Sequence, residues 1–285
     1  MKKFVSVILM CLIVAPVLVV AQEAPQSVPL IKPDVPQSYS LFKKTVWRRM
    51  NLQEKQNKPF NSKNGEISRL LIQAVDEGLL RPYGSDSCIN FMPDIQFTSN
   101  ISVERDENPF ISGGDGFSTF DDSSAEETET VDDGPKRDDI PPEFFSILYL
   151  KEEVVFDRNR SRMYNYIQTV SLYLPASAGT DWNPGGFEKL AGHFRYEDIV
   201  ELFKTHYADK AIWYNVQNQA SHLNFADAFE LRLFSAPITK ISNAEDIDIR
   251  QQYGDLIQQD PMNAMIIQQQ YEYELMEYES ELWEY

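Results

Sequence analysis

The chain has 285 residues and carries 44 Asp and Glu against 26 Lys and Arg, which gives a formal charge of −18 at pH 7. Phosphate backbones and anionic lipids repel a protein this acidic, so the composition argues against nucleic-acid binding and against binding to anionic membrane surfaces. The length allows a hydrophobic core of ordinary size, arranged as one large domain or two small ones.

The first 21 residues have the pattern of a secretory signal. Lys2 and Lys3 precede an apolar run from Phe4 to Val20, which ends in small residues where a signal peptidase would cut. We expect residues 1–21 to be removed on export, because the run is short for a membrane span and a polar, proline-rich stretch follows it. Cys11 does not suit a lipoprotein anchor, since a bulky methionine precedes it.

Residues 22–42 predict an extended arm. The stretch QEAPQSVPLIKPDVPQSYS holds four prolines, which prevent a long helix and favour an extended chain. Such an arm is either a plain spacer or a segment that wraps a neighbouring subunit.

The charge reverses in the next stretch, KKTVWRRMNLQEKQNKPF. This basic segment is either a solvated face or a dock for an acidic partner. On the second interpretation the candidate partner-binding residues are Lys43, Lys44, Arg48, Arg49 and Lys55. We expect Arg48 and Arg49 to lie near acidic groups, in this chain or in a neighbour.

A core helix is predicted near residues 67–75. Its apolar positions recur at intervals of three and four, as one face of a helix requires: Ile67, Leu70, Leu71, Ala74 and Val75. Gly78 lies where a helix commonly ends.

Residues 104–140 predict a mobile acidic insertion. Acids, Gly, Ser and Thr dominate it, and few apolar side chains are present to offset the entropy of ordering. The GGDGFSTFDD stretch lacks the alternating Asp/Asn spacing and the closing Glu of a helical calcium loop. A solvated acidic loop is therefore favoured over a calcium site.

Two β-prone runs predict a hairpin over about 144–175. FFSILYLKEEVVFD and MYNYIQTVSLYLP are rich in β-branched and aromatic residues, and the polar RNRSR joins them. Alternation along the second run places one set of side chains on one side of the sheet: Tyr164, Tyr166, Gln168 and Val170. The other side receives Asn165, Ile167, Thr169 and Ser171.

Helices are predicted again in RYEDIVELFKTHY, in NFADAFELRLF and over about 261–285. Asn224 can cap the second of these. Asp260 followed by Pro261 is a cap with the favoured first-turn proline.

The C-terminal helix combines an apolar stripe with many glutamates. Its stripe recurs every seven residues, at Ala264, Ile267, Tyr271, Leu275, Tyr278, Leu282 and Tyr285. Like-charge repulsion makes this helix poor alone, so we expect its stripe to cover either its own core or a neighbour. The second alternative gives five candidate partner-binding residues: Tyr271, Leu275, Tyr278, Leu282 and Trp283.

Together these elements predict an α+β fold. A small antiparallel sheet that contains the hairpin packs with several helices, and an extended N-terminal arm and a C-terminal helix flank it. Residues 43–285 would form one domain, interrupted by the acidic insertion.

The sequence offers no motif for catalysis or metal binding. His193, His206 and His222 lie in no Cys/His cluster, and Cys88 is the single cysteine beyond the signal, so the fold must rest on packing. No Gly-rich phosphate loop follows a strand, and Ser161 lacks the glycines of a hydrolase elbow. We therefore predict no catalytic residue, no cofactor and no metal.

Several segments together resemble the GldN/PorN family of gliding motility and type IX secretion in Bacteroidetes. WRRMNLQEKQNKPF is similar to the family's Arg-rich opening, and LKEEVVFDRNRSRMYNYIQTVSLYLP to its lysine–glutamate, aromatic, FDKxRS segment and following strand. FADAFELRLFSAPITKISN and the ending ESELWEY resemble its later helix and its terminal LWEF. Asn51 replaces the family's usual Asp, and Val154 and Val155 replace an aromatic residue, as in a divergent member.

The resemblance implies a non-enzymatic structural subunit, exported to the periplasm and associated with the inner face of the outer membrane. Family members form a ring with a GldK/PorK-like lipoprotein and contact the periplasmic region of a GldM/PorM-like motor protein. Neither nucleic acid nor a transmembrane segment is implied. The alternatives are an independent periplasmic or surface binding protein, for instance for peptidoglycan, and, less favoured, a polysaccharide hydrolase.

Overall fold

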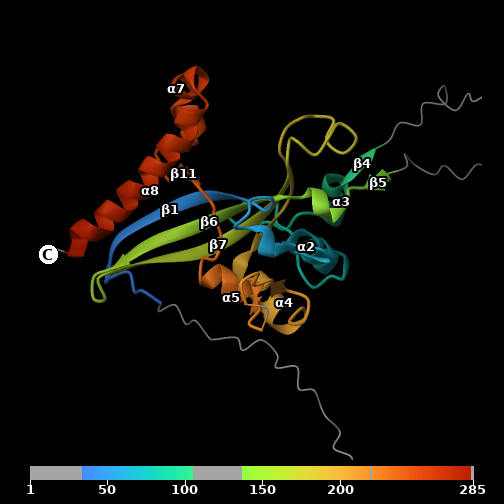
Figure 1. Ribbon diagram of the computed structural model, residues 1–285, viewed down its shortest axis with the longest axis horizontal. Coiled ribbons are helices and arrows are strands. Elements are labelled where there is room, and N and C mark those ends of the chain that lie inside the picture. The colour runs from blue at the N-terminus through green and yellow to red at the C-terminus, as the bar shows by residue number, and fades with distance from the viewer. Residues whose placement is uncertain (1–33, 105–136, 219, 284–285) are drawn as a thin grey trace, which may run out of the picture.

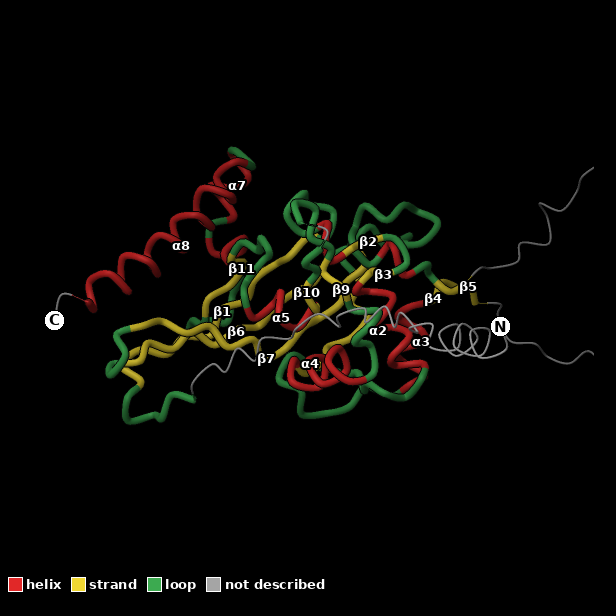
Figure 2. The backbone as a smooth tube through the Cα atoms, turned by 60° about the horizontal axis from the view of Figure 1, so that its bottom comes forward, coloured by secondary structure: helices red, strands yellow, loops and turns green. Residues whose placement is uncertain are grey.

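The computed structural model describes residues 34–104, 137–218 and 220–283. The predicted signal, the first twelve residues of the predicted arm and residues 105–136 of the predicted insertion lie outside this part of the chain. An antiparallel sheet packs with several helices in the rest, so the predicted α+β class is confirmed (Figures 1 and 2).

The elements follow one another in mixed order. The strands are β1 (Ser40–Asn51), β2 (Asn61–Ser62), β3 (Gly65–Glu66), β4 (Ser102–Glu104), β5 (Arg137–Asp139), β6 (Ile147–Asp157), β7 (Arg162–Leu174), β8 (Lys189–Arg195), β9 (Ile212–Trp213), β10 (Leu223–Asn224) and β11 (Ile238–Ile241). The α-helices are α2 (Ile67–Asp76), α3 (Asp94–Ile101), α4 (Tyr196–Thr205), α5 (Phe225–Glu230), α6 (Ile249–Gln252), α7 (Gly254–Gln259) and α8 (Met262–Trp283), and short 3-10 turns lie at Lys58–Phe60 and Pro142–Phe144. The four predicted helices are confirmed as α2, α4, α5 and α8.

An antiparallel sheet in the order β11-β1-β6-β7-β8 forms the centre of the fold. β1 lies inside this sheet, between β6 and β11, so the basic segment begins with an interior strand. Val46, Arg48 and Met50 are buried on one face of β1, whereas the residues between them are half-exposed. The strand begins at Ser40 and therefore includes the end of the predicted arm.

The predicted hairpin over 144–175 is confirmed, because β6 and β7 pair along their whole length. The pairing skips Gln168, which forms a β-bulge. A bulge reverses the facing of the residues on one side of it relative to simple alternation. Ile167 and Val170 therefore lie on the same, core-facing side, and the predicted alternation that separated them is wrong.

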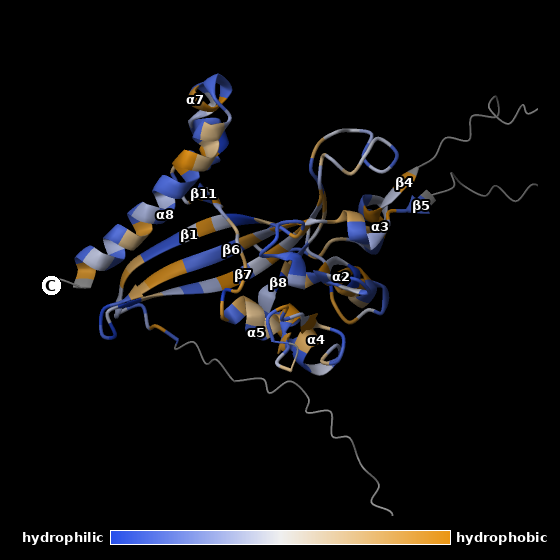
Figure 3. Cartoon of the chain, in the orientation of Figure 1, coloured by the Kyte–Doolittle hydropathy of each residue, from blue (hydrophilic) through white to orange (hydrophobic). Residues whose placement is uncertain are grey.

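Two hydrophobic clusters cover one face of the sheet. The main cluster joins the sheet to α2, α4 and α5 and includes Met50 and Leu150. The α8 cluster is built on Val46 and Val154, with side chains of α8 packed against it. Val46 and Met50 share a face of β1, so the two clusters occupy neighbouring halves of one surface. Figures 1 and 2 accordingly place α8 at one end of the molecule and α2 and α4 at the other, and Figure 3 shows the apolar bands along the strands.

The loop between α2 and α3 covers part of the opposite face. The backbones of Tyr83 and His193 exchange two hydrogen bonds, which tie this loop to β8. The Asp86 carboxylate accepts from the Trp47 indole N–H at 2.9 Å, and the Asp86 carbonyl accepts from the Thr169 hydroxyl at 2.9 Å. Through these contacts the loop packs over polar side chains of β1 and β7 on this face.

The residues on either side of the predicted acidic insertion lie side by side. β4 and β5, which flank residues 105–136, pair with each other in antiparallel fashion. Because the two ends lie side by side, a long segment can be accommodated there without opening the main cluster.

Gly192 generates the first prediction. A Cβ atom at this position would lie 3.2 Å from Pro82 Cβ and 3.3 Å from the Phe97 ring. We expect Gly192→Ala to lower the free energy of unfolding by about 1–3 kcal/mol through overpacking. Gly84→Ala is the control, because the nearest atom to its new Cβ, the Asn90 carbonyl oxygen, is 4.0 Å away. Urea denaturation of both variants tests this, and equal stabilities would contradict it.

Candidate functional site

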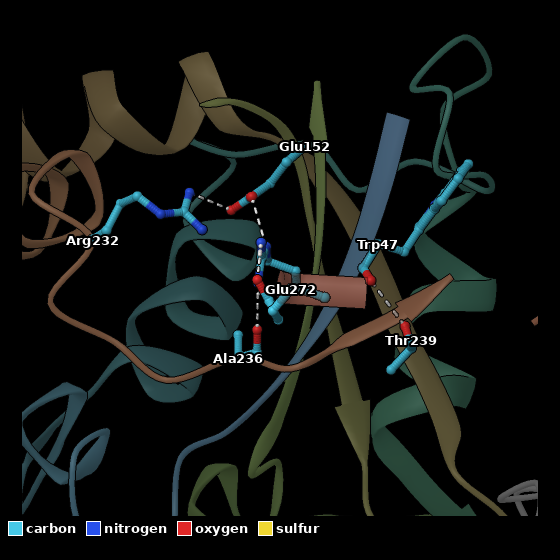
Figure 4. A network of polar contacts seen from close by, with 7 residues as sticks. Trp47, Glu152, Arg232, Ala236, Thr239 and Glu272 are labelled. Atoms are coloured by element: carbon cyan, nitrogen blue, oxygen red, sulfur yellow. Dashed lines mark hydrogen bonds and ion pairs between the residues drawn. The ribbon is translucent and has the colours of Figure 1, made fainter. Parts of the chain in front are cut away.

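Arg48, from the basic segment, lies at the centre of a buried ionic network. Its Nε donates to Glu152 at 3.0 Å and its Nη1 to the Ala236 carbonyl at 3.0 Å. Nη2 donates to Glu272 of α8 at 3.1 Å, and Nη1 also contacts the same carboxylate. The second oxygen of Glu152 accepts from Arg232 at 2.9 Å. Figure 4 shows these groups converging between β6, α8 and the chain that leads into β11.

Burial makes this network costly to disturb. The Glu152 side chain is fully buried, and Arg48 is 8% exposed. Burial acts to lower the pKa of Arg48, but hydrogen bonds and attraction from Glu272 and Glu152 outweigh it and raise the pKa. The guanidinium therefore stays charged, and its partners are carboxylates of its own chain.

Arg49 points to the other face of the sheet and also finds an acid. Its Nη2 donates to Glu188 at 2.7 Å, and the Tyr149 hydroxyl donates to the other Glu188 oxygen at 2.8 Å. The expectation that Arg48 and Arg49 lie near acidic groups is thus confirmed within this chain.

The lysines of the basic segment are more accessible than its arginines. Lys43 is exposed and forms an ion pair with Glu153, and Lys44 is exposed with its Nζ 5.4 Å from the centre of the Phe42 ring. Lys55 is exposed in the loop that follows β1. The structure therefore separates the candidate basic residues into two arginines bound within the fold and three lysines at its surface.

The inner face of α8 packs on its own sheet. Ile267, Tyr271 and Leu275 lie against the α8 cluster, and the Tyr278 ring centre is 4.7 Å from that of Phe42. Polar contacts reinforce this packing, since Glu279 accepts from the backbone N–H of Met163 at 3.1 Å. Leu282 is half-buried, and Trp283 ends the helix with its side chain outside the described part.

The outer face of α8 carries a second apolar stripe that sequence reasoning missed. It consists of Met262, Met265, Ile266, Tyr273 and Met276. These positions recur at helical spacing with Gln269 between them, so the signal was present in the sequence beside the inner stripe. We name this set the outer stripe.

A Ser–His contact lies on the polar face of the sheet. The Ser171 hydroxyl and His193 Nδ1 are 2.6 Å apart, and both residues line a cleft of about 490 Å³ together with Trp47, Tyr149 and Tyr173. Both side chains are largely buried. Among the described residues, no three His, Cys, Asp or Glu side chains converge in a way that could hold a metal ion.

Comparison with known families identifies the chain. A model of the family described as "Gliding motility associated protein GldN" matches residues 35–284. The chain belongs to the GldN family. The match spans the central sheet, the ionic network and the whole of α8, and the expected resemblance is confirmed. Membership associates the protein with gliding motility and type IX secretion.

Two further findings bear on this GldN-family chain. No individual curated protein matches it. Across the described residues, none of the helices combines the length and the apolar character that a bilayer crossing requires.

The second prediction concerns the ionic network of this GldN-family fold. Glu152→Ala leaves Arg48 and Arg232 without their shared buried partner, and we expect it to cost about 3–5 kcal/mol of unfolding free energy. Glu272→Ala should cost only about 1–2 kcal/mol, because its side chain is partly exposed and Arg48 keeps Glu152. Guanidinium denaturation at neutral pH measures both, and a milder effect of Glu152→Ala would contradict the central role of that carboxylate.

The third prediction concerns pH. Burial lowers the pKa of His193 below its ordinary 6.5, against an opposing attraction from Asp86. The unfolded chain then binds a proton more readily than the folded one, so stability is full above about pH 6.5 and falls as the pH drops toward the lowered pKa. For a single titrating group the loss in that window cannot exceed about 1.4 kcal/mol per pH unit.

His193→Gln is the matched control for the pH effect. The variant should show a flatter dependence of unfolding free energy on pH between about 6.5 and 5. Parallel pH profiles of the wild type and the variant would show that His193 does not contribute.

Proposed function

We propose that this protein is a non-enzymatic structural subunit of a periplasmic ring that serves type IX secretion and gliding motility. The ring is associated with the inner face of the outer membrane. In this proposal the subunit assembles with a GldK/PorK-like lipoprotein and contacts the periplasmic region of a GldM/PorM-like motor protein. The observation that carries it is the match of the GldN family model, which extends over residues 35–284.

The exposed lysines of the basic segment support an assembly role. Arg48 and Arg49 are held by carboxylates of the fold, whereas Lys43, Lys44 and Lys55 remain exposed. In a chain this acidic, such a group gives a neighbouring acidic surface a defined place to dock. We assign these lysines to contacts with partner subunits.

A second candidate function is glycan binding, for instance to peptidoglycan. The cleft beside Trp47, Tyr149 and Tyr173 favours it, because aromatic rings are common platforms for sugars and polar groups such as Asp86 line the same cleft. Isothermal titration with soluble peptidoglycan fragments tests this reading. Binding that Trp47→Ala abolishes would support it, and no heat of binding would remove it.

The fourth prediction tests the ring. After gentle extraction from a bacterium that carries the secretion system, we expect the tagged protein to elute in a particle far larger than its 32.9 kDa chain. Electron microscopy of that particle should show a closed ring that also contains a lipoprotein. A protein that runs as a free monomer would contradict the proposal.

The lysines provide the matched variants for this test. Lys43→Glu with Lys44→Glu should destabilise the complex, because each exposed ion pair with a partner is modest but several act together. The stability of the variant complex should also depend less on salt concentration. Lys63→Glu with Lys210→Glu makes the same change of charge at exposed positions outside the basic segment and should leave the complex intact.

A further inference from the structure

α8 presents two opposite apolar faces, and only one of them is covered in the described structure. The inner face packs on the α8 cluster, whereas each residue of the outer stripe is 56–58% exposed. From Met262 to Met276 the outer stripe extends for about 21 Å along the helix, at 1.5 Å per residue. Single exposed apolar residues are normal on a protein surface, but an aligned set of this length marks an interaction site.

The composition of the outer stripe suits a helical partner. Three of its five residues are methionines, whose flexible thioether side chains adapt to the shape of an apolar ligand. Surfaces of this kind bind the apolar face of an amphipathic helix in helix-in-groove recognition.

The charges of α8 define the other property of that partner. The helix holds five glutamates and no Lys or Arg. Glu272 and Glu279 bond to the sheet side, as described above. Glu274, Glu277 and Glu281 are exposed and recur at intervals of three and four, so they lie along one flank at the C-terminal end of the outer stripe.

We propose that the outer stripe docks an amphipathic helix of another protein, one whose apolar face is flanked by Lys and Arg. A second copy of α8 does not fit, because that helix has no Lys or Arg to complement these glutamates. An anionic membrane surface does not fit for the same reason. The docking surface deepens the proposed assembly role and rests on it, since it names the chemistry of one contact that a ring subunit would make.

The fifth prediction measures this contact with a defined probe. The probe is a synthetic helical peptide of about 20 residues with a leucine stripe flanked by lysines, labelled for fluorescence anisotropy and titrated with the mature chain. We expect saturable binding that weakens with added salt. A matched peptide with glutamate in place of every lysine should not bind, and equal binding of both peptides would overturn the proposal.

Substitutions in α8 locate the contact. Met265→Gln with Met276→Gln keeps side-chain size and helix propensity but removes apolar surface, and should weaken peptide binding by about ten-fold or more. Ile89→Gln with Ile95→Gln makes the same kind of change at exposed positions outside α8 and should have no effect. Glu277→Gln with Glu281→Gln should reduce the salt dependence. Unchanged binding by the Met265→Gln, Met276→Gln protein, with helicity retained by circular dichroism, would overturn the proposal.

A photo-crosslinking residue at Met276 distinguishes the possible occupants in cells. Adducts to a segment of another protein with the apolar and basic pattern would support the proposal. Adducts to α8 of a second copy, adducts to lipid, or tight binding of the purified chain to phosphatidylglycerol vesicles would overturn it.

The outcomes for the ring and for the docking surface are separable. Peptide binding by a protein that forms no large complex would remove the proposed ring and leave the docking surface in place. A ring that assembles normally from a protein that cannot bind the peptide would remove the proposed docking surface and leave the proposed ring in place.

Discussion

A buried arginine holds the two halves of this fold together. Arg48 lies on β1 between Val46, which belongs to the α8 cluster, and Met50, which belongs to the main cluster. Arg48 therefore lies where the two clusters meet. Its guanidinium bonds to Glu152 of β6 and to Glu272 of α8. Such a buried ion pair adds little net stability over apolar packing, but it penalises any arrangement that leaves a charge unpaired. It therefore fixes where α8 lies on the sheet.

The sequence predicts elements with strong local signals and misses features that depend on partners distant in sequence. The hairpin and α8 follow from β-prone runs and from a seven-residue repeat, so both are recognised. β1 is obscured because Arg48 occupies a core-facing position where an apolar residue is expected, and the carboxylate that makes this possible is more than a hundred residues away. The bulge at Gln168 is likewise set by pairing with β6, so alternation alone assigned the wrong faces.

The candidate site shows the same division. Charge patterning indicates that Arg48 and Arg49 need acids nearby, and both find them within the chain. It does not indicate that the arginines would be held in the fold while the neighbouring lysines remain exposed. For α8, helical spacing separates two apolar stripes, but which one meets the sheet depends on Phe42, Val46 and Val154. The spacing of apolar residues shows that the two stripes lie on opposite faces of the helix. It does not show which face packs on the sheet.

The acidity of α8 has a consequence for how the outer stripe is displayed. Repulsion among closely spaced glutamates, opposed to the helix dipole, makes the isolated segment a poor helix, and contacts with the sheet offset that cost. Glu272 and Glu279 contribute by bonding to Arg48 and to the backbone of β7. The outer stripe is therefore aligned only when the inner face is docked. A change at Arg48 that loosens α8 should disorder the outer stripe without touching it, so the ionic network and the docking surface are energetically coupled.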